Sequence, residues 1–169
     1  MSVGVILDRP KYEVNVGSVL RSAEIFGARE IVIIGTRYVR GSHGRWRAPT
    51  DVLNSAKRLN LREVDTMAEA LALFPDHFIV VVERKMGGAL LPAFRHPLDA
   101  VYVFGPEDGV VDEASVLLSG AEPAHVEIPA HLSVCNEHIG SLNLAQAVTV
   151  TLYDRISKTG AYLCAKGGQ

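Results

Sequence analysis

The sequence predicts an α/β protein with a mostly parallel sheet flanked by helices. Short apolar runs with the length of buried strands alternate with segments that carry helical patterns, as in strand–helix–strand units. The chain has 169 residues, 48% of them hydrophobic, which is enough to form one core. No repeat, low-complexity tract or linker divides it, so we expect a single domain over residues 1–169.

Five apolar runs predict the strands of this sheet. Each has five or six residues and is bounded by turn residues such as Gly, Pro and Asp. In chain order, the predicted strands are 3–7, 30–35, 78–83, 101–105 and 125–129.

Helical patterns occupy the intervals between the strands. In chain order, the predicted helices are 16–26, 51–59, 66–74, 112–120 and 141–156. We expect Asn15 to cap the first helix, which should end before Gly27. Thr66 and Glu69 have the spacing of a capping box, so the helix over 66–74 should begin there.

The last helix begins at two small polar residues, Ser141 and Asn143. Such residues either cap a helix or present polar groups to a ligand, because the first turn leaves backbone N–H groups without partners. Further along the helix, Leu144, Val148 and Leu152 form an apolar stripe that a partner subunit could cover.

Charge, cysteine content and the start of the chain restrict the class of protein. A formal net charge of −2 argues mildly against a dedicated nucleic-acid binder. Cys135 and Cys164 are too few for a disulfide framework and lack a C-x-x-C spacing, which favours reduced thiols in a cytoplasm. Met1 leads directly into the first predicted strand, so we do not expect export.

One segment departs from this average charge. Residues 31–50 contain no acidic residue, but arginines and aromatic residues are concentrated there. This composition can contact phosphates and stack on bases, although a solvated loop explains it equally well. The candidate RNA-binding residues are Arg37, Arg40, Arg45, Trp46 and Arg47.

Three loops follow the carboxyl ends of the later strands, at 84–92, 105–109 and 129–140. Ligands of open α/β sheets bind at such ends. The Gly and Pro residues in these loops let the backbone approach a ligand closely. We therefore expect the binding site at this edge of the sheet.

Three short motifs lie in or near this edge. Asn15 is followed six residues later by Arg21. A strand leads into Phe104, Gly105, Glu107 and Gly109, and an Ile128-Pro129 pair precedes Ser141-Leu142-Asn143. In this order, the three motifs resemble those of the SpoU/TrmH branch of the SPOUT RNA methyltransferases, and the resemblance covers residues 3–158.

The resemblance implies a SPOUT fold with a deep C-terminal trefoil knot, which no pattern in the sequence predicts. It also implies a homodimer that uses S-adenosylmethionine to methylate a ribose 2′-hydroxyl of RNA. Transfer RNA is favoured over ribosomal RNA, and SLNLAQAV is most similar to members that act on the anticodon loop. A non-catalytic RNA-binding relative is the alternative from another functional class.

The family pattern also assigns site residues. The catalytic candidates are Asn15, Arg21, Glu107, Ser141 and Asn143, and the cofactor-binding candidates are Val82, Glu83, Gly105, Ile128, Ser141 and Leu142. Because a free guanidinium stays protonated, Arg21 is expected to position the substrate rather than to act as a base. Glu107 would orient Arg21 or Asn15, and the identity of the base stays open.

One departure from the family pattern is the twelve residues between Ile128 and Ser141. This segment carries His131, Cys135, Glu137 and His138, but its spacing does not indicate a tetrahedral site, so no metal is expected. We expect instead that this segment changes the shape of the loop that covers the cofactor or of the entrance for the substrate.

Overall fold

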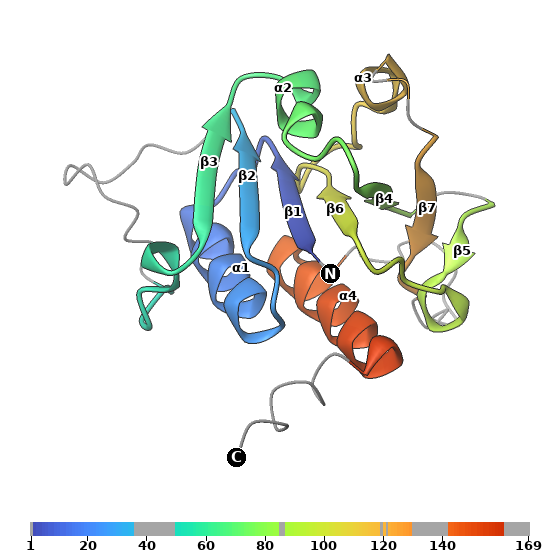
Figure 1. Ribbon diagram of the computed structural model, residues 1–169. Coiled ribbons are helices and arrows are strands. Elements are labelled where there is room, and N and C mark those ends of the chain that lie inside the picture. The colour runs from blue at the N-terminus through green and yellow to red at the C-terminus, as the bar shows by residue number, and fades with distance from the viewer. Residues whose placement is uncertain are drawn as a thin grey trace, which may run out of the picture.

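A computed structural model describes residues 2–35, 50–84, 87–118, 120, 122–129 and 142–160. Its centre is a seven-stranded sheet in which every strand pairs in parallel with its neighbours, in the order β3-β2-β1-β6-β4-β7-β5 (Figure 1). The strands are β1 Val3–Asp8, β2 Glu30–Ile34, β3 Asn60–Val64, β4 Phe78–Val82, β5 Ala89–Leu90, β6 Ala100–Phe104 and β7 Ala124–Glu127. The predicted α/β class and parallel sheet are confirmed.

Helices cover both faces of the sheet, with α1 and α4 side by side on one face and α2 and α3 on the other (Figure 1). The helices are α1 Glu13–Ile25, α2 Met67–Ala72, α3 Glu113–Leu118 and α4 Leu144–Thr159, with short 3-10 turns η1 Ser55–Lys57 and η2 Leu91–Ala93. Successive strand residues serve opposite faces: Val5 packs toward α1 and α4, whereas Ile6 packs toward α2 and α3. Among the described helices, none is long and apolar enough to cross a membrane.

Local signals explain several helix ends. Thr66 and Glu69 form the predicted capping box at the start of α2. Asn143 caps α4, because its Oδ1 accepts a hydrogen bond of 2.9 Å from the Ala145 N–H. Gly27 follows α1 with a φ of +80°, a conformation that favours glycine.

One prediction about residues 51–64 was wrong, and one strand in this stretch was not predicted. Instead of a helix over 51–59, the chain forms only η1, where the Asp51 carboxylate accepts hydrogen bonds from the N–H groups of Ser55 and Ala56. The next residues form β3, which was not predicted. Its polar residues lie mostly at the surface because β3 is an edge strand, so no apolar run marks it.

The apolar stripe predicted for a partner subunit was also wrong. Leu144, Val148 and Leu152 are 6%, 0% and 0% exposed, because they pack into the core of their own chain. The apolar residues that α4 exposes are Val150 and Tyr153. On α1, the exposed apolar residues include Ile25, which is 59% exposed.

Candidate active site

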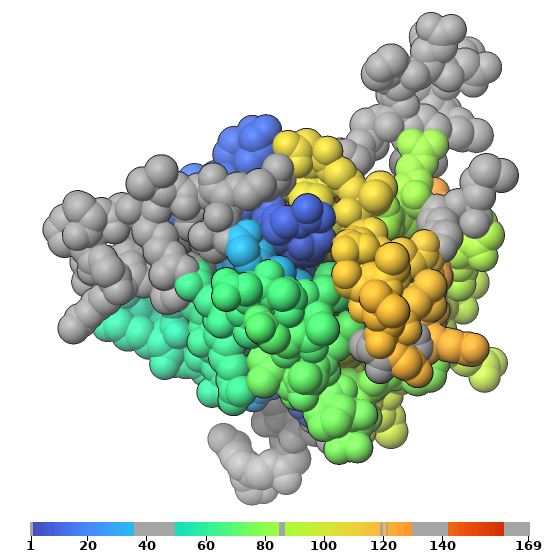
Figure 2. Space-filling view, turned by 90° about the horizontal axis from the view of Figure 1, so that it is seen from above, coloured from blue at the N-terminus to red at the C-terminus, as the bar shows by residue number. Residues whose placement is uncertain are grey.

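The order of the strands defines where the site lies. From β1 the chain proceeds outward through β2 and β3 on one side. The later strands lie on the other side of β1, and β6 is the one that pairs with it. The carboxyl ends of β1 and β6 therefore flank the point where the strand order reverses, which is where open parallel sheets bind ligands. Figure 2, viewed down onto this edge, shows residues from the start of the chain beside residues that follow β6.

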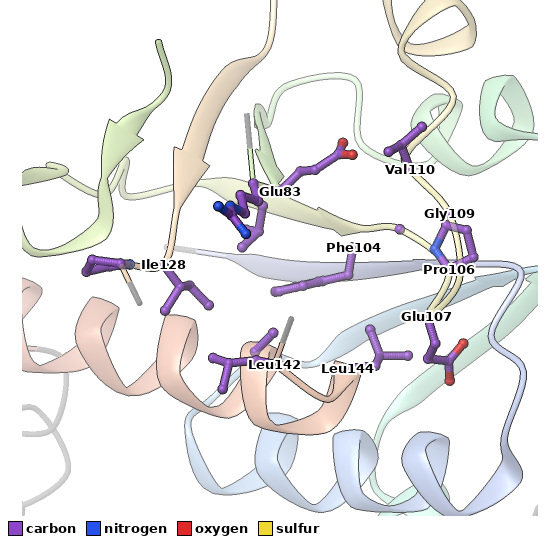
Figure 3. A pocket seen from close by; sticks show the side chains of 14 residues that line it. Glu83, Phe104, Pro106, Glu107, Gly109, Val110, Ile128, Leu142 and Leu144 are labelled. Atoms are coloured by element: carbon purple, nitrogen blue, oxygen red, sulfur yellow. The ribbon is translucent and has the colours of Figure 1, made fainter. Parts of the chain in front are cut away.

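A pocket of about 350 Å³ opens at this edge (Figure 3). Its walls come from the ends of β4, β6 and β7 and from the residues that begin α4. Phe104, Ile128, Leu142 and Leu144 supply apolar surface, and Glu83 and Glu107 supply carboxylates. A volume in the range of roughly 300–1,000 Å³ with a few polar groups is typical of a site for a small molecule or cofactor.

Of the six predicted cofactor-binding residues, Val82, Glu83, Gly105, Ile128 and Leu142 line this pocket. The sixth, Ser141, lies outside the described residues. Gly105 fits closely in its surroundings, because a Cβ there would lie 3.1 Å from the backbone N of Val111. A larger residue would require the backbone at Val111 to shift by a few tenths of an ångström.

At the rim of the pocket, three predicted catalytic residues from distant parts of the chain are hydrogen-bonded in a row. Asn143 Nδ2 donates to Asn15 Oδ1 over 2.9 Å, and Asn15 Nδ2 donates to Glu107 Oε1 over 3.0 Å. The Ala145 N–H can only donate, so it fixes the Asn143 oxygen toward α4 and leaves the amide nitrogen for Asn15. The direction of every bond in the row follows from this one.

Asn15 does not cap α1, which corrects the sequence prediction. The helix begins at Glu13, Tyr12 occupies the cap position, and Asn15 lies inside the first turn with 8% exposure. Its side chain therefore has no capping role. It instead joins the end of β6, through Glu107, to the start of α4, through Asn143.

The second oxygen of Glu107 is also held. Glu107 Oε2 accepts a hydrogen bond of 2.8 Å from the backbone N–H of Lys11, and Lys11 Nζ contacts Asp108 at 3.3 Å. The Asp108 carboxylate raises the pKa of Lys11. Lys11 was not among the predicted site residues, although it follows the carboxyl end of β1 closely, at the edge of the sheet where ligands of open α/β sheets bind.

Asn15 and Asn143 also line a second hollow, of about 360 Å³, whose walls come from α1 and α4. Ser18, Gln146 and Thr149 lie along it. The row of hydrogen bonds therefore leads from the edge of the first pocket, at Glu107, to this second hollow. Two hollows that share one polar row could hold two reactants close together.

Arg21 is not part of this row. It is exposed on α1, and six residues of helix place it about 120° around the axis from Asn15. It therefore lies on the outer side of α1, in the same region of the helix as the exposed Val14 and Ile25. Within one chain the structure does not bring Arg21 to the other catalytic candidates.

Several predicted residues lie outside the described part of the chain. These are the RNA-binding candidates Arg37, Arg40, Arg45, Trp46 and Arg47, and the segment with His131, Cys135, Glu137 and His138. Among the residues that are described, no three His, Cys, Asp or Glu side chains form a group that could hold a metal ion.

The sequence matches the model of the SpoU rRNA Methylase family over residues 2–153. No curated protein matches the chain significantly in sequence.

Solved structures show the same fold. AviRb, a SpoU methyltransferase from Streptomyces viridochromogenes, is 22% identical, with a TM-score of 0.72 over 95% of this chain, which spans 61% of AviRb. A structure solved to explain the 2-OH methylation of C/U34 on tRNA is 24% identical, with a TM-score of 0.69 over 94% of this chain and 91% of that one. The A. aeolicus TrmH/SpoU tRNA modifying enzyme is 20% identical, with a TM-score of 0.73 over 96% of this chain and 79% of that one.

Proposed function

Because the chain belongs to the SpoU rRNA methylase family, we propose that it transfers a methyl group from S-adenosylmethionine to a ribose 2′-hydroxyl of RNA. The observation that carries this proposal is the hydrogen-bonded row Asn143–Asn15–Glu107. It unites members of all three motifs at the rim of a pocket whose size suits a cofactor.

The residues of the pocket fit S-adenosylmethionine. Apolar walls from Phe104, Leu142 and Leu144 suit the adenine, and the close approach of the chain at Gly105 leaves backbone groups next to the ligand. The charged side chains of the pocket are Glu83, Glu107 and Arg84, which can face the cationic groups and the carboxylate of the cofactor. When bound, the cofactor supplies an activated methyl group. AviRb has been solved in complex with AdoMet, and it shares this fold.

The protein's own contribution is positioning, which can lower a barrier by roughly 7–11 kcal/mol. We propose that the second hollow receives the target nucleotide, so that the amides of Asn15 and Asn143 orient its sugar. Glu107 accepts hydrogen bonds at both oxygens, from Asn15 and from the Lys11 N–H. Its proposed role is therefore to fix the position of Asn15, not to accept the proton of the ribose hydroxyl. The group that accepts the hydroxyl proton stays open.

We propose transfer RNA as the substrate, with the anticodon loop as the favoured target. The similarity to the structure solved for methylation of C/U34 on tRNA supports this, because the two chains cover more than nine tenths of each other. Ribosomal RNA is the second candidate, favoured by the name of the matching family. Because the proposed substrate is RNA, we also propose that the protein is cytoplasmic.

Incubating the protein with labelled S-adenosylmethionine and total RNA, followed by mass spectrometry of the nucleosides, tests this function. A 2′-O-methylated nucleoside in tRNA is expected. A base-methylated product, or label only in ribosomal RNA, would contradict the corresponding part of the proposal. RNA binding without any calorimetric heat from S-adenosylmethionine would favour the non-catalytic alternative.

We further propose that the active form is a homodimer joined through α1 and α4. These adjacent helices expose apolar side chains, at Val14 and Ile25 on α1 and at Val150 and Tyr153 on α4, and Arg21 lies on the same side of α1. A second copy on this face would supply the arginine that each row lacks. We also propose the C-terminal trefoil knot that the family resemblance implies.

Arg21→Ala is expected to lower methylation at least ~10²-fold, because a cation that stabilises developing negative charge is lost. The affinity for S-adenosylmethionine should stay nearly unchanged, since Arg21 does not line the pocket. Single-turnover rates and calorimetry measure the two effects. Arg29→Ala, which removes an exposed arginine just beyond α1, is the control. Equal activity in both variants would remove Arg21 from the mechanism.

Replacing Arg45 and Arg47 together by alanine should weaken RNA binding and reduce its dependence on salt. For single-stranded RNA, each phosphate that a cation no longer neutralises lowers the slope of log K against log salt by about 0.7. A filter-binding titration at several salt concentrations measures the slope. The paired control replaces Arg29 and Arg62, which are both exposed. An unchanged slope in the Arg45/Arg47 variant would refute the RNA-binding assignment.

A further inference from the structure

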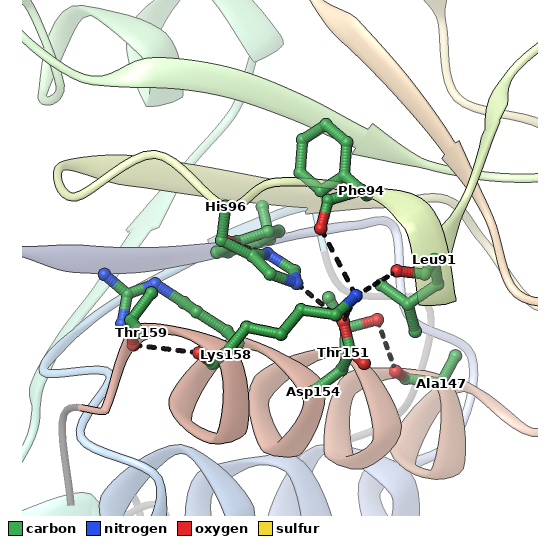
Figure 4. Close-up of polar contacts among 10 residues, drawn as sticks. Leu91, Phe94, His96, Ala147, Thr151, Asp154, Lys158 and Thr159 are labelled. Atoms are coloured by element: carbon green, nitrogen blue, oxygen red, sulfur yellow. Dashed lines mark hydrogen bonds and ion pairs between the residues drawn. The ribbon is translucent and has the colours of Figure 1, made fainter.

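A second polar cluster lies away from the pocket, between α4 and the 91–98 segment that connects β5 to β6 (Figure 4). His96 is its centre. The side chain is fully buried, with Nδ1 2.7 Å from the Tyr102 hydroxyl on β6 and Nε2 2.8 Å from Asp154 Oδ2 on α4. The edge of the Phe94 ring also packs against it. One imidazole thus links the helix, the sheet and the connecting segment.

The partners of His96 fix its protonation state. The ionised Asp154 carboxylate can only accept, so His96 Nε2 must carry a proton and donate it. Nδ1 is then free to accept the hydrogen bond of the Tyr102 hydroxyl. A neutral ring satisfies both contacts. A second proton, on Nδ1, would make the ring a donor at both nitrogens, so the Tyr102 hydroxyl would have to turn and accept where it had donated.

Cations on α4 hold the same segment. Lys158 Nζ donates to Asp154 Oδ2 and to the carbonyls of Leu91 and Phe94, over 2.6, 2.5 and 3.2 Å. Arg155 is 1% exposed and donates to the Leu98 carbonyl over 2.7 Å. The charged groups that face His96 are therefore Asp154, Lys158 and Arg155, all on α4, and β6 contributes the Tyr102 phenol.

Protonation of His96 would place a third cation beside a single carboxylate. Burial lowers the pKa of His96 below its ordinary value, against the attraction of Asp154, and the charges of Lys158 and Arg155 lower it further. The fold therefore favours the neutral ring. The stabilisation is complete above the ordinary His pKa of 6.5 and is lost as the pH falls below it.

The cluster is connected to the proposed active site through α4. This helix has 16 residues, so it is about 24 Å long, and Asp154 lies eleven residues after Asn143. Leu144 and Ala147, at the other end of the helix, line the pocket. A change in how the C-terminal half of α4 is held therefore reaches the position of Asn143 and of one pocket wall.

We propose that His96 is a proton-operated latch: the neutral ring holds the C-terminal half of α4 on the 91–98 segment, and its protonation releases α4 and weakens binding in the pocket. The part that concerns binding rests on the proposed function.

Amide hydrogen exchange of α4 at about pH 7.5 and about pH 5.5, corrected for intrinsic rates, tests the latch. In the wild-type protein, protection of residues 152–159 should fall about threefold or more on acidification. It should stay constant in His96→Gln, which cannot titrate. His125→Gln is the matched control, because His125 pairs with Glu113 on the other face and should follow the wild type. Equal protection at both pH values, or the same loss in His96→Gln, would overturn the latch.

An NMR titration and a calorimetric measurement test the latch and its link to the pocket separately. If His96→Gln does not fold, a wild-type NMR titration of the His96 ring replaces it: a midpoint shared with the loss of α4 protection supports the latch, and a titration without that loss overturns it.

Calorimetry with S-adenosylmethionine at both pH values should show several-fold weaker binding at the lower one. A constant affinity overturns the link to the pocket. Absence of binding at both values would instead count against the proposed function, while the exchange data still decide the latch.

Discussion

Asn15→Ala is expected to lower the rate of methyl transfer by about 10²-fold, because the middle of the hydrogen-bonded row is lost and the sugar is no longer held in line. Asn15→Asp should be equally inactive. It keeps the shape of the side chain but turns an oxygen, instead of a donor, toward Glu107 Oε1, which lies 3.0 Å away. Single-turnover assays with saturating S-adenosylmethionine measure the rate.

Asn60→Ala and Asn60→Asp are the matched controls. Asn60 is an exposed asparagine at the start of the edge strand β3, where its amide donates to Glu30 and lines neither hollow. We expect cofactor affinity to be preserved in all these proteins, since neither Asn15 nor Asn60 lines the first pocket. A rate for Asn15→Asp close to that of Asn60→Asp would exclude a role for the amide in positioning.

Leu152→Ala should have the largest effect on stability. Leu152 is fully buried where α4 packs into the core, and deleting a leucine there costs about 3 kcal/mol of unfolding free energy. For a chain of this size, that corresponds to a fall in Tm of roughly 6–12 °C, measurable by calorimetry.

The neighbouring residue provides the comparison. Tyr153 is 59% exposed, so Tyr153→Ala should leave the Tm of a monomer nearly unchanged. If α1 and α4 form the proposed dimer face, the same substitution should shift the mass measured by light scattering toward a monomer. A small effect of Leu152→Ala on Tm would contradict the burial of this side of α4.

The sheet and the meeting of three motif residues could be predicted from the sequence, because buried parallel strands are apolar runs and their carboxyl ends share one edge. Other features could not. The prediction of Asn15 as a cap was wrong because helix caps and ligand sites favour the same small polar side chains. The prediction of a partner over the stripe with Leu152 was wrong because periodicity identifies an apolar side of a helix, not the surface that covers it.

The cluster around His96 escaped prediction for a different reason. His96 and Asp154 are 58 positions apart, and neither belongs to a motif. Only the packing of α4 on the 91–98 segment brings them together. Arg155 likewise has the sequence pattern of a surface residue on a helix, although its long side chain ends in a buried position against backbone carbonyls.

The bond between Asn143 and Asn15 spans 128 positions of the chain. During synthesis, the amino-terminal half of the row leaves the ribosome long before its carboxyl-terminal partner exists, and such distant contacts are slow to form. Premature termination before α4 would therefore leave Asn15 and Glu107 without Asn143. Coupling α4 to α1 in this way completes the row only after α4 has been synthesised.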